Sequence, residues 1–530
     1  MLFELIRNCR RWYALSCILA TVLCFPVGAV NLSLPRVFTD HMVLQRHQYV
    51  PVWGKAQPEE RVQVSFAGQH YTTVADRQGN WRISLVPMPA NAVPQTMQIS
   101  TDSQQLSLHD LVVGEVWLAS GQSNMRMQVQ QSQPDQEGAA QLDNVQIRLI
   151  DFTNNEFYPE ERVFEPEKLA ELTAQNYFNS AGWQRSGINS NASFSAVGFY
   201  FAVKLQQALQ VPVGVINVSV GGALTENFIA ESTLAIEPEL AHLAPSVYPD
   251  WLSQIAPWCA QRAKLNLSQW LKDHPRQPLA HHAFEPGFLY QAGIAPLANF
   301  AMQGVIWYQG ESNAPLEGDD SSYQGAYNLS LSKHKLKTLI SNWRRQWQRA
   351  DMPFLLVQLP GLNRPWAPFR KMQQEVAEEL NDVGVMVSYD LGEATEVHPK
   401  NKAAVGNRLA QLAQQSVYNV PKAYQPLQVR RIDRVGTDVF LFFSAPVQLA
   451  FADKPMGFML AGKDGKFYAA SAKQSKQSLT LNSPYVSRPC FLRYAWFDDP
   501  KPLANVRSSQ GLPLSPLDIE LQACKVTTEQ

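Results

Sequence analysis

The chain has 530 residues, of which 45% are hydrophobic, and its net charge is −1 at pH 7. A chain of this length is expected to fold as roughly two to four domains with sizeable apolar cores. Because neither a basic stripe nor an acidic tail is present, the composition argues against a nucleic-acid partner and against electrostatic binding to a membrane surface.

The first residues have the pattern of a targeting segment. Three arginines precede an apolar run at 12–27, and a small residue, Ala29, follows shortly after it. This order of basic, apolar and small-residue regions predicts an export signal, residues 1–29, with cleavage after Ala29. The apolar run is short for a membrane span, and Pro26 interrupts it. We therefore expect an exported protein, periplasmic or secreted, with no membrane segment after cleavage; a retained anchor is the alternative.

The cysteines do not form a disulfide framework. Six are present, but three lie in the predicted export signal, and Cys259, Cys490 and Cys524 are widely spaced. In an oxidising compartment one bridge can form, between Cys490 and Cys524. No cluster of Cys and His has the spacing of a zinc site, and the sequence predicts neither a metal nor another cofactor.

Residues 30–107 alternate apolar and polar positions between turn signals. Short strands are predicted at 50–54, 62–66 and 81–85, with a hairpin turn at 76–80. Strands of this length and spacing are typical of a small β-sandwich, which is therefore expected as the first folded domain.

The pattern changes over residues 108–420, where apolar segments alternate with helical stretches. Such alternation is typical of an α/β domain, in which a parallel sheet carries helices on both faces. The predicted strands are 111–119, 213–218, 304–308, 354–359 and 383–389, and the predicted helices are 196–209, 332–349, 371–380 and 400–415. Two polar stretches, 131–190 and 232–285, are interpreted as insertions at the edge of a cleft.

Strands return after residue 420. They are predicted at 439–443, 479–481 and 491–496, so we expect a second β domain over residues 421–530. The predicted order along the chain is thus the export signal (1–29), an N-terminal β domain (30–107), the α/β domain (108–420) and a C-terminal β domain (421–530).

A serine follows the first predicted strand of the α/β domain. The strand ends in a turn at 120–121, and Gln122-Ser-Asn-Met125 begins a helix. Ser123 would then lie at the carboxyl edge of the sheet, where open α/β folds bind their ligands. Its N–H would lie at the positive end of a helix, where an oxyanion can be held. Ser123 is therefore the candidate nucleophile; the alternative is that it only caps the helix.

A serine nucleophile needs a base, and His398 is the candidate. It follows the last predicted strand and a polar loop, and it directly precedes Pro399 and a helix at 400–415. Two loops at the same edge of a parallel sheet can converge, which would bring His398 to Ser123. A surface capping role is the alternative.

The third member of a triad orients the imidazole and stabilises its charged form. Three acidic residues precede His398 on its loop: Asp390, Glu393 and Glu396. We prefer Glu396, with Glu393 next. Loop acids that are simply solvated, and an Asp390 that ends the strand, are the alternatives.

Two further strand ends offer donors for an oxyanion. Gly221 and Gly222 follow one strand, and paired glycines let the backbone approach a ligand and present an N–H. Gln309 follows another strand, and its side-chain amide can donate to an oxyanion. The alternative for Gln309 is a hydrogen bond that ties two loops together.

A second serine competes as nucleophile. Asn217-Val-Ser219-Val-Gly221 resembles the G-x-S-x-G elbow, with Asn217 in place of the first glycine. The surroundings of Ser123 lack the last glycine of that elbow. Neither segment matches the α/β-hydrolase pattern, so a different serine-hydrolase fold is expected.

Four internal segments carry a resemblance to a known family. They are Gly121-Gln-Ser-Asn-Met125, Val220-Gly-Gly222, Gly304-Val-Ile-Trp-Tyr-Gln-Gly-Glu-Ser-Asn313 and the block from Asp390 to Lys402 with His398-Pro399 inside it. They resemble the blocks of the sialate O-acetylesterase family, which belongs to the SGNH, or GDSL-like, hydrolases. Residues 35–46 resemble its opening block, and residues 493–496 and 511–516 resemble its closing block.

The resemblance implies a flavodoxin-like SGNH hydrolase domain flanked by N- and C-terminal β-sandwich-like domains. It implies a serine esterase that hydrolyses acetyl esters of sialic acid, at the 9-O position, or of other sugars, through an acetyl-enzyme and without a cofactor. By motif position, Ser123 would be the nucleophile and His398 the base. The amides of Ser123 and of Gly221 or Gly222, together with Gln309, would form the oxyanion hole.

Three features depart from the family pattern. Thr395 stands where many SGNH enzymes carry an aspartate three residues before the histidine. The acid is therefore open, and a Ser–His dyad supported by a backbone carbonyl is an alternative. Arg126 stands where an acidic or small residue is expected, and residues 217–220 lack a tryptophan that often precedes the paired glycines. Both changes touch the cleft and can alter which sugar is accepted.

Two alternative functions remain open at this point. The first is an acetyl xylan or other polysaccharide esterase that uses the same machinery. The second, from another class, is a carbohydrate-binding surface protein whose hydrolase core is inactive. The sequence assigns no oligomeric state.

Overall fold

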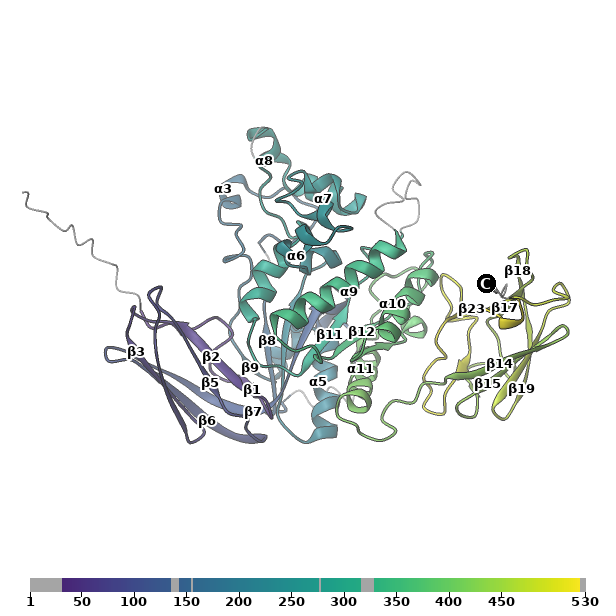
Figure 1. Ribbon diagram of the computed structural model, residues 1–530, viewed down its shortest axis with the longest axis horizontal. Helices are drawn as coiled ribbons and strands as arrows, with labels where there is room; N and C mark the ends of the chain where they lie inside the picture. The colour runs from purple at the N-terminus through teal and green to yellow at the C-terminus, as the bar shows by residue number, and fades with distance from the viewer. Residues whose placement is uncertain (1–30, 135–142, 154–155, 276–277, 316–327, 525–530) are drawn as a thin grey trace, which may run out of the picture.

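The computed structural model describes residues 31–134, 143–153, 156–275, 278–315 and 328–524. The predicted export signal, with its three cysteines, lies outside these residues. The described chain is elongated: N-terminal strands occupy one end, a helix-covered sheet the middle and C-terminal strands the other end (Figure 1). Across the described residues, no helix is both long and apolar enough to span a bilayer.

The central sheet holds six parallel strands in the order β13-β12-β11-β7-β10-β8, with β9 antiparallel at one edge. These strands are β7 (Gln105–Gly121), β8 (Ile147–Asp151), β9 (Gln184–Arg185), β10 (Val213–Ser219), β11 (Gly304–Tyr308), β12 (Phe354–Val357) and β13 (Val383–Met386). Because β7 lies between β10 and β11, the chain changes sides of the sheet after β10. Open α/β sheets bind their ligands at such a point, at the carboxyl ends of the strands.

Successive residues of the sheet strands face opposite layers. On β7, Val116 and Leu118 pack into the core shared with α9 and α10, whereas Trp117 and Ala119 pack into the core shared with α5 and α11. The helices are α5 (Ala196–Leu209), α9 (Leu329–Gln346), α10 (Ala367–Glu379) and α11 (Lys402–Ser416). The prediction of a sheet with helices on both faces is therefore confirmed.

All five predicted strands of the sheet are present, but β8 was missed. Its residues, Ile147–Asp151, lie inside the stretch interpreted as an insertion. The strand is short and buried almost throughout, so it lacks the alternation that marks a half-exposed strand. The interpretation of 131–190 as an insertion was therefore wrong at residues 147–151.

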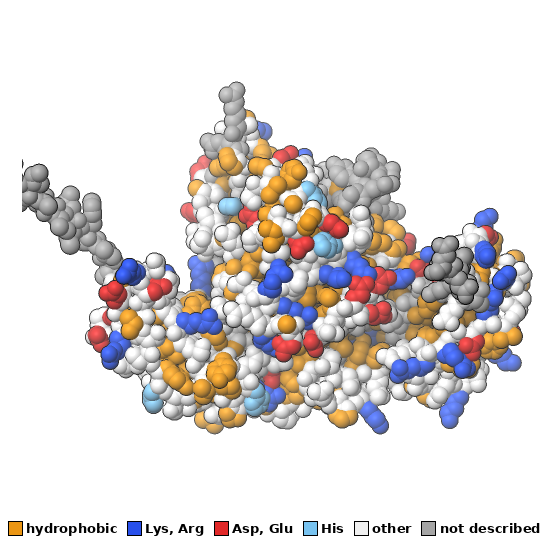
Figure 2. Space-filling view, viewed as in Figure 1, with side chains coloured by type: hydrophobic (Ala, Val, Ile, Leu, Met, Phe, Trp, Pro, Cys, Tyr) orange, Lys and Arg blue, Asp and Glu red, His pale blue; other side chains and the backbone are white. Residues whose placement is uncertain are grey.

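The helices α9 and α10 carry a network of surface charges. Side chains of both signs gather over these two helices (Figure 2). Lys333 pairs with Glu375 at 2.8 Å and with Glu379 at 2.5 Å, and Lys337 pairs with Glu379 at 2.9 Å. Exposed pairs of this kind contribute little to stability, and their mixed signs agree with the near-zero net charge.

The N-terminal strands are β1 (Val43–Gln45), β2 (Val50–Lys55), β3 (Arg61–Phe66), β4 (Gln69–Val74), β5 (Asn80–Leu85) and β6 (Asn91–Ser100). The predicted turn at 76–80 is present, because Asp76 accepts hydrogen bonds from the N–H groups of Gln78 and Asn80. It does not join a hairpin, since β4 pairs with β3 whereas β5 pairs with β2. The first half of β7 pairs with β1 and β6, so the boundary predicted at residue 107 falls inside β7.

The C-terminal strands form two four-stranded antiparallel sheets, β14-β15-β20-β19 and β18-β17-β21-β23, and a pair, β16-β22. Their bounds are β14 (Val429–Val435), β15 (Asp438–Phe443), β16 (Gln448–Leu449), β17 (Phe458–Ala461), β18 (Phe467–Ala469), β19 (Ser471–Ser475), β20 (Ser478–Asn482), β21 (Phe491–Tyr494), β22 (Val506–Arg507) and β23 (Leu517–Glu520). A disulfide joins Cys490 to Cys524, the one bridge that the sequence allowed.

Candidate active site

Ser123 and His398 meet at the carboxyl edge of the central sheet. Ser123 opens a short helix, α1 (Ser123–Arg126), immediately after β7. His398 lies on the loop between β13 and α11. Although 275 residues separate them, the Oγ of Ser123 lies 2.8 Å from the Nε2 of His398. This is the geometry that a serine nucleophile and its general base require.

The turn that presents Ser123 depends on glycine. Gly121 has φ +139°, and a Cβ there would lie 2.1 Å from the carbonyl oxygen of Tyr308. The next residue, Gln122, donates its N–H to that same carbonyl at 3.0 Å. Its side-chain Oε1 accepts from the N–H groups of Gly310, at 3.4 Å, and Ser312, at 3.2 Å. The nucleophile turn is therefore fixed to the loop that follows β11.

Three backbone N–H groups beside Ser123 are available to an oxyanion. Those of Ser123, Gly221 and Gly222 make no hydrogen bond within the described part of the chain, and all three residues line the same pocket. At Gly221 a Cβ would lie 1.8 Å from the hydroxyl of Tyr158, and Gly222 has φ +73°. Because α1 has only four residues, we attribute oxyanion binding here to individual N–H groups rather than to a helix dipole.

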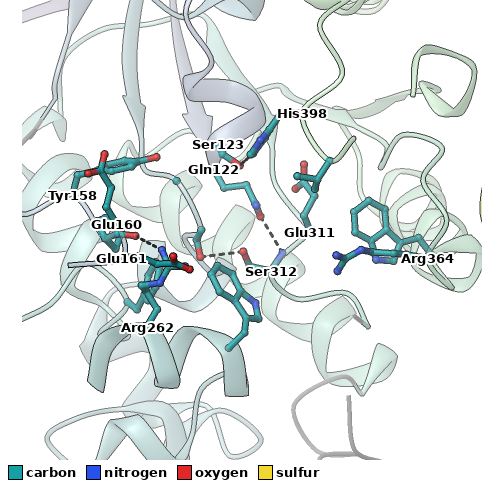
Figure 3. A pocket seen from close by; sticks show the side chains of 17 residues that line it. Gln122, Ser123, Tyr158, Glu160, Glu161, Arg262, Glu311, Ser312, Arg364 and His398 are labelled. Atoms are coloured by element: carbon teal, nitrogen blue, oxygen red, sulfur yellow. Dashed lines mark hydrogen bonds and ion pairs between the residues drawn. The ribbon is translucent and has the colours of Figure 1, made fainter. Parts of the chain in front are cut away.

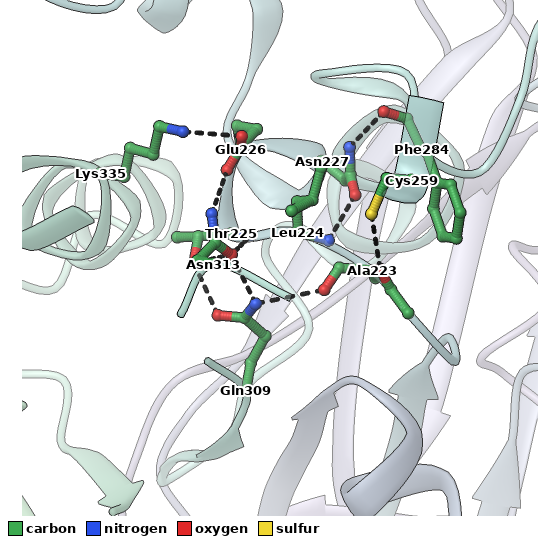
Figure 4. Close-up of polar contacts among 11 residues, drawn as sticks. Ala223, Leu224, Thr225, Glu226, Asn227, Cys259, Phe284, Gln309, Asn313 and Lys335 are labelled. Atoms are coloured by element: carbon green, nitrogen blue, oxygen red, sulfur yellow. Dashed lines mark hydrogen bonds and ion pairs between the residues drawn. The ribbon is translucent and has the colours of Figure 1, made fainter. Parts of the chain in front are cut away.

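Gln309 is buried behind the pocket rather than in its wall. Its Nε2 donates to the carbonyl of Ala223, at 3.2 Å, and to the Oδ1 of Asn313, at 2.6 Å. Its Oε1 accepts from the hydroxyl of Thr225 at 2.7 Å (Figure 4). These contacts match the alternative to oxyanion binding that the sequence left open for Gln309, which is a hydrogen-bonded tie between the loops after β10 and β11.

A buried ion pair stands behind this tie. Asn313 donates to Glu226 at 2.9 Å, and Glu226 pairs at 2.7 Å with Lys335 from α9 (Figure 4). The side chains of Glu226 and Lys335 are 1% and 4% exposed. The loop with Gly221 and Gly222 is thus anchored to a helix that packs on the sheet.

The competing serine lies away from the pocket. Ser219 ends β10, is 2% exposed and donates its hydroxyl to the Oδ1 of Asn217 at 2.8 Å. It is not among the residues that line the pocket with Ser123. Burial and this hydrogen bond leave Ser219 without access to a substrate.

The acidic residues before His398 bind the main chain. Glu396 accepts a hydrogen bond from the N–H of His398 at 2.8 Å, and its carboxylate lies 3.9 Å from the Nδ1 of the ring. Glu393 accepts from the N–H of Lys400 at 3.4 Å. Within the described residues no carboxylate lies within hydrogen-bond distance of Nδ1. Glu396 is thus the acidic residue whose carboxylate comes nearest to the ring among those described, and its role as the third member of a triad stays a prediction.

Asp390 is occupied by two arginines. It binds Arg408 of α11 through both oxygens, at 2.7 Å each, and it accepts from Arg507 of β22 at 3.1 Å. The pairing ties the start of the histidine loop to α11 and to the C-terminal strands. This acid therefore holds the base of the loop rather than the imidazole.

The pKa of His398 lies below its ordinary value. Burial is the first cause, the ammonium of Lys402 is the second, and the carboxylate of Glu396 opposes them. A lowered pKa favours the neutral imidazole, which is the form that can accept a proton from Ser123.

A pocket of about 540 Å³ opens over Ser123 and His398 (Figure 3). Its aromatic wall consists of Tyr158, Trp258, Phe284 and Trp366. Tyr158 comes from the first predicted insertion, whereas Trp258 and Phe284 come from the second, 232–285. Both stretches therefore contribute to the rim of the cleft, as predicted. In the described chain, no group of three or more His, Cys, Asp and Glu side chains is arranged to hold a metal ion.

Two arginines line the pocket and differ in their surroundings. Arg262 pairs with Glu161 at 2.9 Å and donates to the carbonyl of Pro159, so its charge is compensated. The guanidinium of Arg364 makes no ion pair or hydrogen bond to any described residue, and Figure 3 shows it directed into the pocket. Arg364 is half-buried and brings a positive charge without a described ion-pair partner to the pocket that Ser123 and His398 also line.

Sequence reasoning gave no role to several residues of this site. Asn124, Glu311 and Lys402 lie inside the motifs that carry the family resemblance, but their contacts join distant segments. Arg364 lies in a loop without any motif signal. Their position inside a motif could therefore have pointed to Asn124, Glu311 and Lys402. The sequence offered no comparable signal for Arg364.

Comparisons with known proteins show similarity to one family of carbohydrate esterases. A family model described as "Carbohydrate esterase, sialic acid-specific acetylesterase" matches residues 260–415. The sialate O-acetylesterase of Mus musculus is 28% identical over 347 residues, which are 60% of this chain and 58% of the mouse protein. The sialate O-acetylesterase of Rattus norvegicus is 26% identical over 411 residues, which are 70% of each chain.

A solved structure covers more of the chain. The crystal structure of a novel carbohydrate acetylesterase from Xanthomonas citri superposes with a TM-score of 0.73 at 27% identity, over 92% of this chain and 100% of that one. The match to the mouse relative, by contrast, spans a little over half of that relative's length. The matching family model, the named relatives and this shared architecture all support the sialate O-acetylesterase family as the one that this chain resembles.

Proposed function

We propose that this protein is a carbohydrate O-acetylesterase with a serine nucleophile, and specifically a sialate 9-O-acetylesterase. The observation that carries the proposal is the 2.8 Å contact between Ser123 Oγ and His398 Nε2. Unengaged N–H groups at Ser123, Gly221 and Gly222 lie in the same pocket. The similarity to carbohydrate and sialate acetylesterases supports the acetyl ester as the scissile group, and the 9-O position follows from the family resemblance alone.

The proposed reaction has two half-reactions. In the first, Ser123 Oγ attacks the acetyl carbonyl carbon while His398 Nε2 takes the hydroxyl proton, and the three N–H groups hold the oxyanion. The C–O bond to the sugar then breaks, and the imidazolium protonates the departing sugar oxygen. In the second, water attacks the acetyl-serine, His398 accepts a proton from the water, and acetate leaves as Ser123 regains its hydrogen.

One side chain of the pocket, Arg364, supports an acidic sugar over a neutral one, although glutamates line the pocket as well. Sialic acid carries a carboxylate, and Arg364 offers a guanidinium without a described ion-pair partner, the side chain best suited to bind a carboxylate. The aromatic wall favours no sugar in particular, because rings stack on any sugar face. Acetylated xylan, the substrate of the alternative polysaccharide esterase, has no carboxylate at the acetylated residue for Arg364 to bind.

The test is an acetate-release assay over a panel of substrates. We expect the highest kcat/KM with 9-O-acetylated sialic acid and a much lower value with acetylated xylan. The opposite order would make the runner-up, a polysaccharide esterase, the better description. Binding of acetylated sugars without acetate release, together with failure of a phosphonate probe to label Ser123, would instead indicate an inactive core that only binds carbohydrate.

The remaining expectations are part of the same proposal. The sheet between two helix layers supports the flavodoxin-like SGNH prediction, and the flanking strands support β-sandwich-like domains at residues 30–107 and 421–530. Export to the periplasm or the medium is supported by the disulfide between Cys490 and Cys524, because such bonds persist in oxidising compartments.

A further inference from the structure

A buried amide connects the two catalytic loops. Asn124, the residue after Ser123, is completely buried. Its Nδ2 donates to the carbonyl of Val397, the residue before His398, at 2.9 Å and to the Oε1 of Glu311 at 2.5 Å. Its Oδ1 accepts from the Nζ of Lys402 at 2.5 Å. One side chain therefore contacts the strand end after β11, the histidine loop and the start of α11.

The two charged partners of Asn124 are buried as well. Glu311 is 4% exposed and Lys402 is 0% exposed, and the Oε2 of Glu311 has no hydrogen-bond partner in the described structure. The Nζ of Lys402 also lies 5.4 Å from the centre of the Tyr308 ring. Burial lowers the pKa of Lys402 to about 7 and raises the pKa of Glu311, so keeping either group charged at this place is costly. Buried charges that adjoin a reactive pair are candidates for a functional role.

We infer that Asn124, Glu311 and Lys402 form a positioning network for His398, which fixes the histidine loop to the nucleophile turn and places a buried ammonium behind the imidazole. The inference rests on the proposed esterase function. In a complete triad, a carboxylate at Nδ1 orients the ring. Here the nearest carboxylate oxygen is 3.9 Å from Nδ1, and the loop is instead held through its main chain, by Asn124 at Val397 and by Glu396 at His398.

The network has a consequence for pH dependence. The charged groups around His398 are Lys402 from α11, Glu396 and Glu393 from its own loop, and Glu311 from the end of β11, which acts on Lys402. A positive charge disfavours a second one nearby, so Lys402 contributes to the lowered pKa of His398. Activity falls as the pH drops through that pKa, because imidazolium cannot accept the serine proton. Lys402 therefore extends the active range toward acid.

The test compares pH profiles of kcat/KM for acetate release. In the wild type, we expect the acidic limb to lie below the ordinary histidine pKa of about 6.5. Lys402→Met removes the ammonium and is expected to move the limb upward. Glu396→Gln is the control of opposite sign: it removes the carboxylate that raises the pKa of His398, so the limb is expected to move downward.

Three outcomes would overturn the inference. They are a wild-type limb above the ordinary histidine value, a folded Lys402→Met whose limb does not move, and shifts of the same sign in both variants. A wild-type limb above the ordinary histidine value overturns the inference even where Lys402→Met fails to fold. Loss of the esterase proposal itself would look different, because the wild type would then release no acetate or Ser123→Ala would release it normally.

Discussion

Arg364 is the residue whose role depends most on the identity of the substrate. Its guanidinium has no partner among the described residues, so a substrate carboxylate would be its first counter-ion. A hydrogen bond to a charged group contributes about 1.5–3 kcal/mol. Removing the guanidinium of Arg364 should therefore slow the hydrolysis of acidic sugars only.

We predict that Arg364→Ala lowers kcat/KM for O-acetylated sialic acid by about 10- to 100-fold, mainly through KM. The methyl ester of the same sugar, which lacks the negative charge, should be hydrolysed at nearly the same rate by both proteins. Steady-state kinetics with the two substrates make the comparison. Equal losses on both would show that Arg364 supports the pocket without binding a carboxylate.

Single residues also show how far sequence reasoning reaches into the site. Ser123 and His398 could be predicted because each follows a recognisable strand and occupies a motif. The contacts of Gln309 could not, since a strand-terminal amide can face a pocket or a neighbouring loop equally well. The partners of Asn124 include a residue 278 positions away, and no local pattern encodes such a pairing.

At the scale of elements, the loop after β10 depends on α9. The pair between Glu226 and Lys335 links them, and both side chains are almost fully buried. Removal of one partner leaves an uncompensated buried charge, which costs far more than a lost surface pair. The same helix also offers an exposed ion pair for comparison with the buried one, because Lys337 pairs with Glu379 at the surface.

We predict that Lys335→Met lowers the free energy of unfolding by about 3–5 kcal/mol. Lys337→Met should lower it by no more than about 1 kcal/mol. Urea unfolding followed by tryptophan fluorescence measures both. Similar small losses in the two variants would mean that the buried pair does not anchor the loop.

Long helices and uninterrupted apolar strands were the easiest elements to predict. The helix predicted at 196–209 coincides with α5, and the strands predicted at 304–308 and 213–218 match β11 and β10 closely. The short strand β8 was missed because Arg148 and Asp151 interrupt its apolar run. The hairpin predicted at 76–80 failed for another reason: turn residues specify the turn, but partners elsewhere in the chain decide which strands pair.

At the scale of the whole molecule, the two β regions are joined to the central sheet by charged contacts. At one end, Asp110 of β7 contacts His41, Arg148 and Arg185. At the other end, Asp390 binds Arg408 and Arg507, next to the histidine loop. The C-terminal strands therefore support the loop that carries the base.

The disulfide lies in that C-terminal region and closes a segment of 34 residues. A cross-link over such a segment stabilises a domain by about 2–4 kcal/mol, chiefly by restricting the unfolded chain. We predict that replacing Cys490 and Cys524 by alanine lowers the melting temperature in calorimetry while kcat at 25 °C stays unchanged, because neither cysteine lines the pocket. An unchanged melting temperature would show that the bridge adds no stability.

The central claim is that Ser123 carries the acetyl group. The decisive measurement is the rate of acetate release by Ser123→Ala, with Ser219→Ala as the control for the competing buried serine. We predict that Ser123→Ala loses about 10³- to 10⁶-fold in kcat with an unchanged melting temperature, whereas Ser219→Ala retains most of its activity. Near-normal acetate release by Ser123→Ala would contradict the account.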